Sequence, residues 1–132
     1  MKLNKKLIAV SALLSTLSLS HSALAGIEDD LANICNIVIS NDKSELRKKM
    51  KNVQSDYQMR LSDYYDGITC NGNSLIRTAI LNDAVDTGTL LVKKMPKSKL
   101  QEPETDGMLL AAWIETNGKS DSPISSALTE RL

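Results

Sequence analysis

The sequence predicts an all-α domain, a small disulfide-stapled bundle of five or six short helices. Three observations lead to this prediction. Apolar residues recur at helical spacing in most segments, and residues that start or stop helices separate these segments. The chain also has two cysteines, an even number that favours one bond. With no Phe, three Tyr and one Trp, the core must be mainly aliphatic.

The first 25 residues have the three parts of a secretory signal peptide. Three lysines come first, residues 7–19 are apolar and rich in serine, and residues 23–25 form an Ala-Leu-Ala cleavage site. The apolar run is too short, and too often broken by serine, to serve as a membrane anchor. We therefore expect cleavage after Ala25 and a periplasmic or secreted product without a membrane span.

The expected mature chain is one helical domain, residues 26–132. Removing 25 of the 132 residues leaves 107, with 13 basic and 16 acidic residues and a formal charge of −3. This mild acidity argues against binding to nucleic acid. The only histidine, His21, lies in the signal segment, which excludes Ser/His and Cys/His nucleophiles and histidine metal sites. We expect no cofactor, no metal and no enzymatic activity.

The two cysteines of the mature chain are Cys35 and Cys70. Because an exported protein meets oxidising conditions, we expect them to form a disulfide bond. A C-x-x-C redox pair needs closer spacing, and a zinc site needs four ligands where the chain offers two thiols.

Residues 31–53 predict a first helical hairpin. Its first helix has apolar residues at positions i, i+3, i+4 and i+7, with Asp29 and Asp30 at its N-terminal end. These apolar residues are Leu31, Ile34, Cys35 and Val38. Residues 40–43 form a turn, and Ser44 is the expected N-cap of the second helix. The apolar stripe of that helix contains Leu46, Met50 and Val53.

A second hairpin follows the turn at Asn71-Gly72 and ends at Pro96. Its first helix starts after an N-cap at Asn73 or Ser74 and carries the apolar stripe Leu75, Ile76, Ala79 and Ile80. For the linker, residues 57–70, we expect a loop. The alternatives are a short helical turn at Met59 and Leu61 and a short hairpin of strands further on.

The two hairpins, together residues 31–95, are similar to each other in sequence. Leu31 aligns with Leu75, Cys35 with Ala79, and, after one inserted residue, Met50 with Met95. This pattern indicates either a true repeat or a shared helical period. Residues 72–79, GNSLIRTA, resemble the ankyrin stretch G-x-T-P-L-H-x-A, although Leu75 replaces the proline and the spacing between hairpins is too long. The resemblance implies stacked hairpins and carries no function.

Residues 96–132 predict C-terminal helices after a polar connection. Residues 108–114 are almost all apolar, include Trp113, and predict a central buried helix that stops at Gly118, although a strand is possible for so short a run. Ser122 and Pro123 begin a last helix.

The order of signal peptide, LANIC, LRKKM, YYDGITCNGNSL and LVKKM resembles a family of small exported proteins from Gram-negative bacteria, known only as a domain of unknown function. The likeness covers residues 31–95. If it holds, Cys35, Cys70 and Gly72 are its defining positions. No activity comes with the resemblance.

The best candidate binding surface is basic. Lys43, Arg47 and Lys51 recur every fourth residue along the second expected helix, and a second group of lysines, at 93, 94, 97 and 99, lies at the matching end of the second hairpin. We expect either a solvated face or a docking surface for an anionic envelope component or acidic partner, centred on Lys48, Lys93 and Lys94.

The tyrosines Tyr64 and Tyr65 are either a binding edge or loop anchors. The sequence thus favours an interaction module of the periplasm or cell envelope. The alternative is a small glycan hydrolase that uses carboxylates alone, since that chemistry needs no histidine. The oligomeric state stays open.

Overall fold

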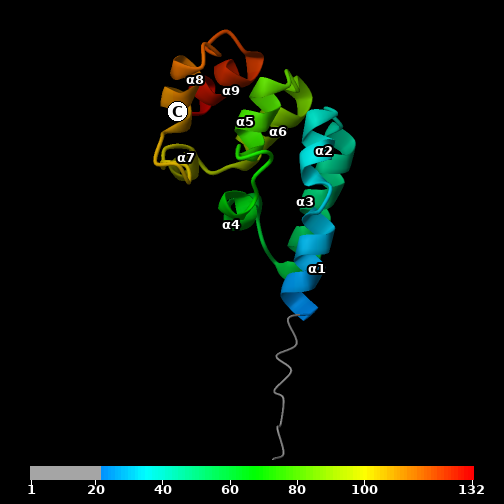
Figure 1. Cartoon of the computed structure of the whole chain (residues 1–132). Helices are drawn as coiled ribbons and strands as arrows, with labels where there is room; N and C mark the ends of the chain where they lie inside the picture. Colours follow the sequence, from blue (N-terminus) through cyan, green and yellow to red (C-terminus); the bar gives the residue numbers. More distant parts are fainter. Residues whose placement is uncertain (1–21) are drawn as a thin grey trace, which may run out of the picture.

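The computed structural model describes residues 22–132, with side chains from residue 26 onwards. This part of the chain is helical, and its only β feature is an isolated bridge between Cys70 and Asn73 (Figure 1). The helices are α1 (Ser22–Leu31), α2 (Ile34–Ile39), α3 (Lys43–Tyr57), α4 (Leu61–Tyr64), the 3-10 turn η1 (Tyr65–Gly67), α5 (Leu75–Leu81), α6 (Val85–Lys94), α7 (Lys97–Leu100), α8 (Leu110–Thr116) and α9 (Pro123–Arg131). The all-α, disulfide-stapled fold is confirmed. The expected signal peptide lies outside the described residues, except that residues 22–25 belong to α1.

Three helical hairpins, α2–α3, α5–α6 and α8–α9, share one way of ending their first helix. In each, the residue after the C-cap has a positive φ: 59° at Asn41, 51° at Asp83 and 65° at Gly118. The N–H of the following residue then bonds to the carbonyl five residues earlier, which completes a Schellman motif. The first two hairpins therefore repeat in their backbone hydrogen bonds, whereas the ankyrin-like resemblance stays a prediction.

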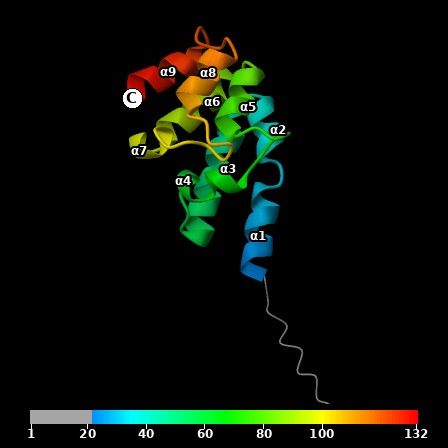
Figure 2. The same cartoon turned by 60° about the vertical axis from the view of Figure 1, so that its left-hand side comes forward.

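The hairpins stack side by side through their helices. α2 packs on α5, α3 packs on α6, and α6 packs extensively on α9 (Figures 1 and 2). Gly88 of α6 permits the last contact, because a Cβ there would overlap the side chain of Ile124 and lie only 3.0 Å from Ala79 Cβ. The apolar stripes of α2, α3, α5, α6 and α9 consequently meet in one core.

Several expected boundaries are wrong, for local reasons. Residues 32–33 interrupt the first expected helix, so that Asp29 and Asp30 end α1 instead of starting a helix. There Tyr57 Oη donates to Asp30 Oδ2 at 3.0 Å. The N-cap of α3 is Asp42 rather than Ser44, because the Asp42 carboxylate accepts the N–H of Glu45 at 3.1 Å. The N-cap of α5 is Ser74, one of the two residues expected.

The linker and the C-terminal region are more helical than expected, and one face of the helix at residues 110–116 is exposed. Residues 61–67 form α4 and η1 instead of a loop, and residues 97–100 form α7. α8 is not a central helix: Trp113 is buried, with 8% exposed, but Ala111 and Ala112 face solvent. Its Leu109 neighbour is 44% exposed.

The disulfide bond joins Cys35 of α2 to Cys70, with the two Cα atoms 5.7 Å apart. Cys70 opens a tight turn in which Asn71 and Gly72 both have positive φ, and Cys70 and Asn73 exchange two backbone hydrogen bonds. Positive φ at both central residues is typical of the type I′ turn, which Asn-Gly favours. The CNGN stretch is therefore a turn that contains one cysteine of the disulfide and leads into α5.

Reducing the disulfide should destabilise the domain by roughly 3 to 4 kcal/mol, because the bond closes a 35-residue separation in the unfolded chain. Urea unfolding with and without reductant measures the difference. The Cys35→Ala/Cys70→Ala variant is the control, and it should match the reduced protein. Equal stability of oxidised and reduced protein would contradict the staple.

Asn41 at the tip of the first hairpin caps a helix of the second. Its Oδ1 accepts the N–H groups of Asp86 at 2.8 Å and Thr87 at 3.0 Å, and its amide donates to Asp86 Oδ2 at 3.2 Å. α6 has Ala84 at its own N-cap position, which offers no side-chain acceptor. The first hairpin thus supplies the cap that the second lacks.

Asn41→Gly should destabilise the protein by about 1 to 2 kcal/mol, because glycine keeps the positive φ but removes the cap of α6. The matched control is Asp83→Gly, which changes the equivalent turn position of the second hairpin and should leave stability unchanged or raise it. Equal effects of the two substitutions in urea unfolding would show that the inter-hairpin cap contributes nothing.

Candidate functional site

The strongest candidate site is a groove between α3, the start of α4 and the end of α6, which we call the basic groove. It has a volume of about 410 Å³. Its lining residues are Arg47, Met50, Lys51, Gln54, Arg60, Leu61 and Lys94. Four of these seven side chains are cationic and none is anionic. Concave sites of this size accommodate small ligands.

Helical spacing explains the wall that α3 contributes. Arg47, Lys51 and Gln54 stand at positions i, i+4 and i+7, so they lie on one face of the helix. Met50, on the inner side of the same face, is 9% exposed and packs into the core. One helix therefore provides both a charged rim and an apolar floor.

The other wall is formed by residues at the ends of two helices. Lys94 is the last residue of α6, where a cation is favoured by the helix dipole. Arg60 precedes α4, after a left-handed residue, Gln58, that ends α3. Asp63 accepts the Arg60 N–H at 2.7 Å and so fixes the start of α4, whose first residue, Leu61, adds to the floor at 5% exposure.

The four cations of the basic groove form no ion pair with any residue that the structure describes. Within the described part of the chain, the ion pairs involve Arg77 and Lys99, and none includes a groove residue. All four cationic side chains belong to exposed residues. Their positive charges are therefore free to meet a ligand.

The structure brings together only some of the residues expected from the sequence. Lys94 lines the groove, whereas Lys48 and Lys93 are exposed on the same helices but do not line it. Tyr64 and Tyr65 are buried, at 6% and 3% exposure, as loop anchors would be. Sequence reasoning missed Arg60, because a single arginine in a linker carries no pattern; only the tertiary fold places it opposite α3.

A second polar cluster surrounds Arg77, a buried residue of α5. Its Nη1 and Nη2 atoms donate to the Asp106 carboxylate at 2.6 and 3.0 Å, and its guanidinium lies 5.1 Å from the ring centre of Trp113. Nε lies 2.5 Å from Glu104 Oε1, but its N–H is not directed at that oxygen, so this contact is an ion pair only. The cluster ties the connection between α7 and α8 to α5.

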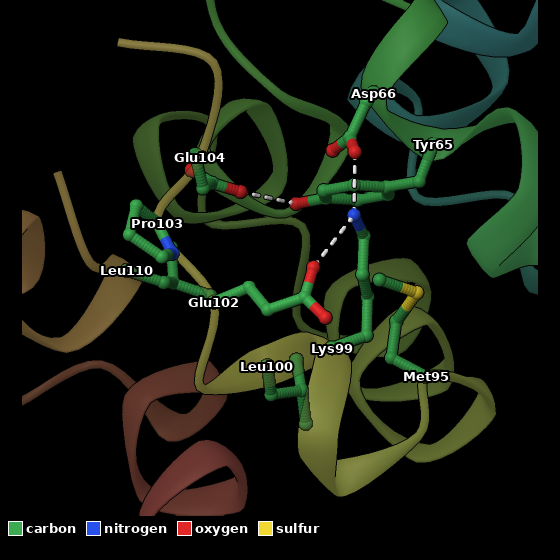
Figure 3. A pocket seen from close by; sticks show the side chains of 9 residues that line it. All are labelled: Tyr65, Asp66, Met95, Lys99, Leu100, Glu102, Pro103, Glu104 and Leu110. Carbon is green, nitrogen blue, oxygen red and sulfur yellow. Dashed lines mark hydrogen bonds and ion pairs between the residues drawn. The ribbon is translucent and has the colours of Figure 1, made fainter. Parts of the chain in front are cut away.

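Glu104 extends the cluster to Tyr65. It accepts from Tyr65 Oη at 2.7 Å and from Ser74 Oγ at 3.1 Å, and burial raises the pKa of Tyr65 above its usual value. Next to Tyr65, Lys99 binds Asp66 at 2.5 Å and Glu102 at 3.2 Å (Figure 3). The cavity among these side chains measures about 10 Å³, room for about one water. These carboxylates are paired, Glu104 in the interior and Asp66 and Glu102 near the surface, and the cavity between them is smaller than a substrate.

In the described part of the chain, no group of His, Cys, Asp and Glu side chains is arranged to hold a metal ion. None of the helices between residues 22 and 132 combines the length and hydrophobicity needed to cross a bilayer.

The Arg77–Asp106 contact should make the free energy of unfolding depend on pH in the acidic range. Hydrogen bonding from Arg77 lowers the pKa of Asp106 from 3.8 to about 2. A depressed carboxyl pKa stabilises the fold above the unfolded value, and this contribution is lost as the pH falls from about 4 to about 2. Asp106→Asn should therefore be less stable than the parent at neutral pH and should lose less stability across that window, as measured by urea unfolding.

The matched control for this titration is Asp121→Asn, an exposed aspartate with no side-chain hydrogen bond among those that the structure shows. It should keep the acid dependence of the parent. If Asp106→Asn also keeps it, the contact does not contribute as described.

Comparison with known proteins gives one match. No curated protein and no solved structure matches the chain. The family model described as "Protein of unknown function (DUF3718)" matches residues 34–102, which are 69 of the 132 residues. The matched segment holds both cysteines and all seven residues of the basic groove. The chain therefore belongs to the DUF3718 family of proteins of unknown function.

Proposed function

We propose that the protein is an exported interaction module of the periplasm or cell envelope, which holds an anionic ligand in its basic groove. The observation that carries the proposal is the convergence of Arg47, Lys51, Arg60 and Lys94 from three elements on one concave surface without an acidic neighbour in its lining. Such a surface attracts anions and raises their local concentration.

The expected location outside the cytoplasm supports this class of function. A signal peptide and a disulfide bond are both typical of proteins outside the cytoplasm. The sequence resemblance to exported proteins of Gram-negative bacteria points the same way. A small stapled scaffold of this kind holds its surface groups in fixed positions, which lowers the entropy cost of binding.

Binding is favoured over glycan hydrolysis by the positions of the carboxylates. A glycoside hydrolase needs two carboxyl groups across a space that admits a sugar. Asp66, Glu102 and Glu104 lie together, but their partners are Lys99, Arg77 and Tyr65, and the cavity between them has room for about one water. The basic groove, which has room for a ligand, has four cations and no carboxylate in its lining.

The test measures binding of three anionic probes, pyrophosphate, octyl phosphate and hexaglutamate, by titration calorimetry at low and high salt. At least one should bind, with an affinity that falls as salt rises. Arg47→Glu combined with Lys51→Glu should weaken that binding tenfold or more, since each reversal near an exposed ligand changes the interaction by about 1 kcal/mol.

The matched control is Lys48→Glu combined with Lys93→Glu. It makes the same change of net charge at exposed lysines of α3 and α6 that do not line the groove, and it should weaken binding far less. Equal losses in both double variants would indicate a diffuse basic face instead of the groove. No binding of any probe would refute the proposal.

A further inference from the structure

The basic groove combines two properties that restrict the kind of anion it fits. Its rim carries four positive charges, and Met50 and Leu61, with 9% and 5% of their surface exposed, form a small apolar floor. A purely polar anion would leave the floor against water. A fatty acid would offer one charge to four cations.

The length of the groove limits how many negative charges a bound peptide can place in it. Arg47 and Gln54 are seven residues apart on α3, which corresponds to about 10 Å of helix. An extended peptide places side chains of one face about 7 Å apart, so an acidic strand would present about two carboxylates over that length. Its two charges would then be spread over the whole length of the groove instead of being concentrated on one group.

A phosphate group satisfies the charge more compactly. A phosphate monoester carries close to two negative charges on one tetrahedral group at neutral pH and offers three acceptor oxygens. The planar guanidinium of an arginine binds phosphate oxygens in pairs, and a lysine binds them as a point charge. Arg47 and Arg60 line the groove from different elements, α3 and the residue before α4, and two lysines share the same lining, so one or two phosphates can contact cations of both elements.

We propose that the ligand of the basic groove is a phosphorylated amphiphile, in which a phosphate monoester or diphosphate adjoins an apolar group. The phosphate lies between Arg47, Arg60 and the two lysines, and the apolar group covers Met50 and Leu61. This inference rests on the proposed anion-binding function and specifies its ligand class.

The test compares probes that differ in one property each, at about pH 8, where a phosphate monoester carries about two charges. Octyl phosphate should bind at least tenfold more tightly than octyl sulfate or octanoate, which carry one charge, and more tightly than inorganic phosphate, which lacks the tail. Affinity should rise from butyl to hexyl to octyl phosphate. It should fall as the pH drops through about 6, because the phosphate then takes up a proton.

Variants locate the site without altering the core. Arg47→Gln and Arg60→Gln should each weaken octyl phosphate binding at least fivefold, whereas Lys48→Gln and Lys93→Gln should leave it within twofold. Phosphatidylcholine vesicles with and without phosphatidic acid distinguish the source: binding to the acidic vesicles with the same variant pattern identifies a lipid headgroup, and binding to octyl phosphate alone identifies a dispersed ligand.

Three results would overturn the inference. They are equal affinity for octyl phosphate and octyl sulfate, no dependence on tail length, or losses in Lys48→Gln as large as those in Arg47→Gln. If hexaglutamate binds in the groove and octyl phosphate does not, the ligand class is wrong while the anion-binding function stands. If no anion binds, both fail.

Discussion

The basic groove depends on the stacking of the first hairpin on the second, because its walls belong to different hairpins. α3 supplies Arg47 and Lys51, and α6 supplies Lys94. Three links fix the register between the hairpins: Asn41 caps α6 at the tip, the Thr87 hydroxyl donates to the Val38 carbonyl at 2.9 Å, and the disulfide holds α2 to the turn that precedes α5. Between these links the contact is apolar, and apolar packing alone is non-directional. Hydrogen bonds and a covalent bond therefore define the position of one wall relative to the other.

The sequence predicts the elements of this arrangement better than their ends. The apolar stripes of α3 and α5 place Leu46, Val53 and Ile76 in the core, where the structure has them. Ser122 and Pro123 begin α9 as expected, with the Ser122 hydroxyl accepting the N–H of Ile124 at 3.2 Å. Such features are legible because they rest on neighbours within one or two helical turns.

The features that sequence reasoning missed depend on partners distant in the chain. The expected helix from Asp29 onwards ignores the contact of Tyr57 with Asp30, 27 residues away. In the sequence, Arg77 stands out only by its place in the ankyrin-like stretch. In the structure it pairs with Asp106 and lies over Trp113. The continuous apolar run at residues 108–114 predicts burial on all sides, but a short helix at the end of a stack has a partner on one side only. The local sequence pattern carries no information about contacts between residues so far apart in the chain.

The two polar regions of the domain differ in whether their cations are paired with carboxylates. Arg77 and Lys99, which lie deeper, are matched by carboxylates, as an ion in a low-dielectric interior must be. The four cations of the basic groove are left without such partners, although the chain as a whole has as many acidic as basic residues. Repulsion among like charges across one small groove opposes folding, and a nearby aspartate or glutamate in its lining would relieve it. No carboxylate in the lining relieves this repulsion, so a bound anion would do so, and it would stabilise the folded state by an amount that grows with the ratio of its concentration to its Kd.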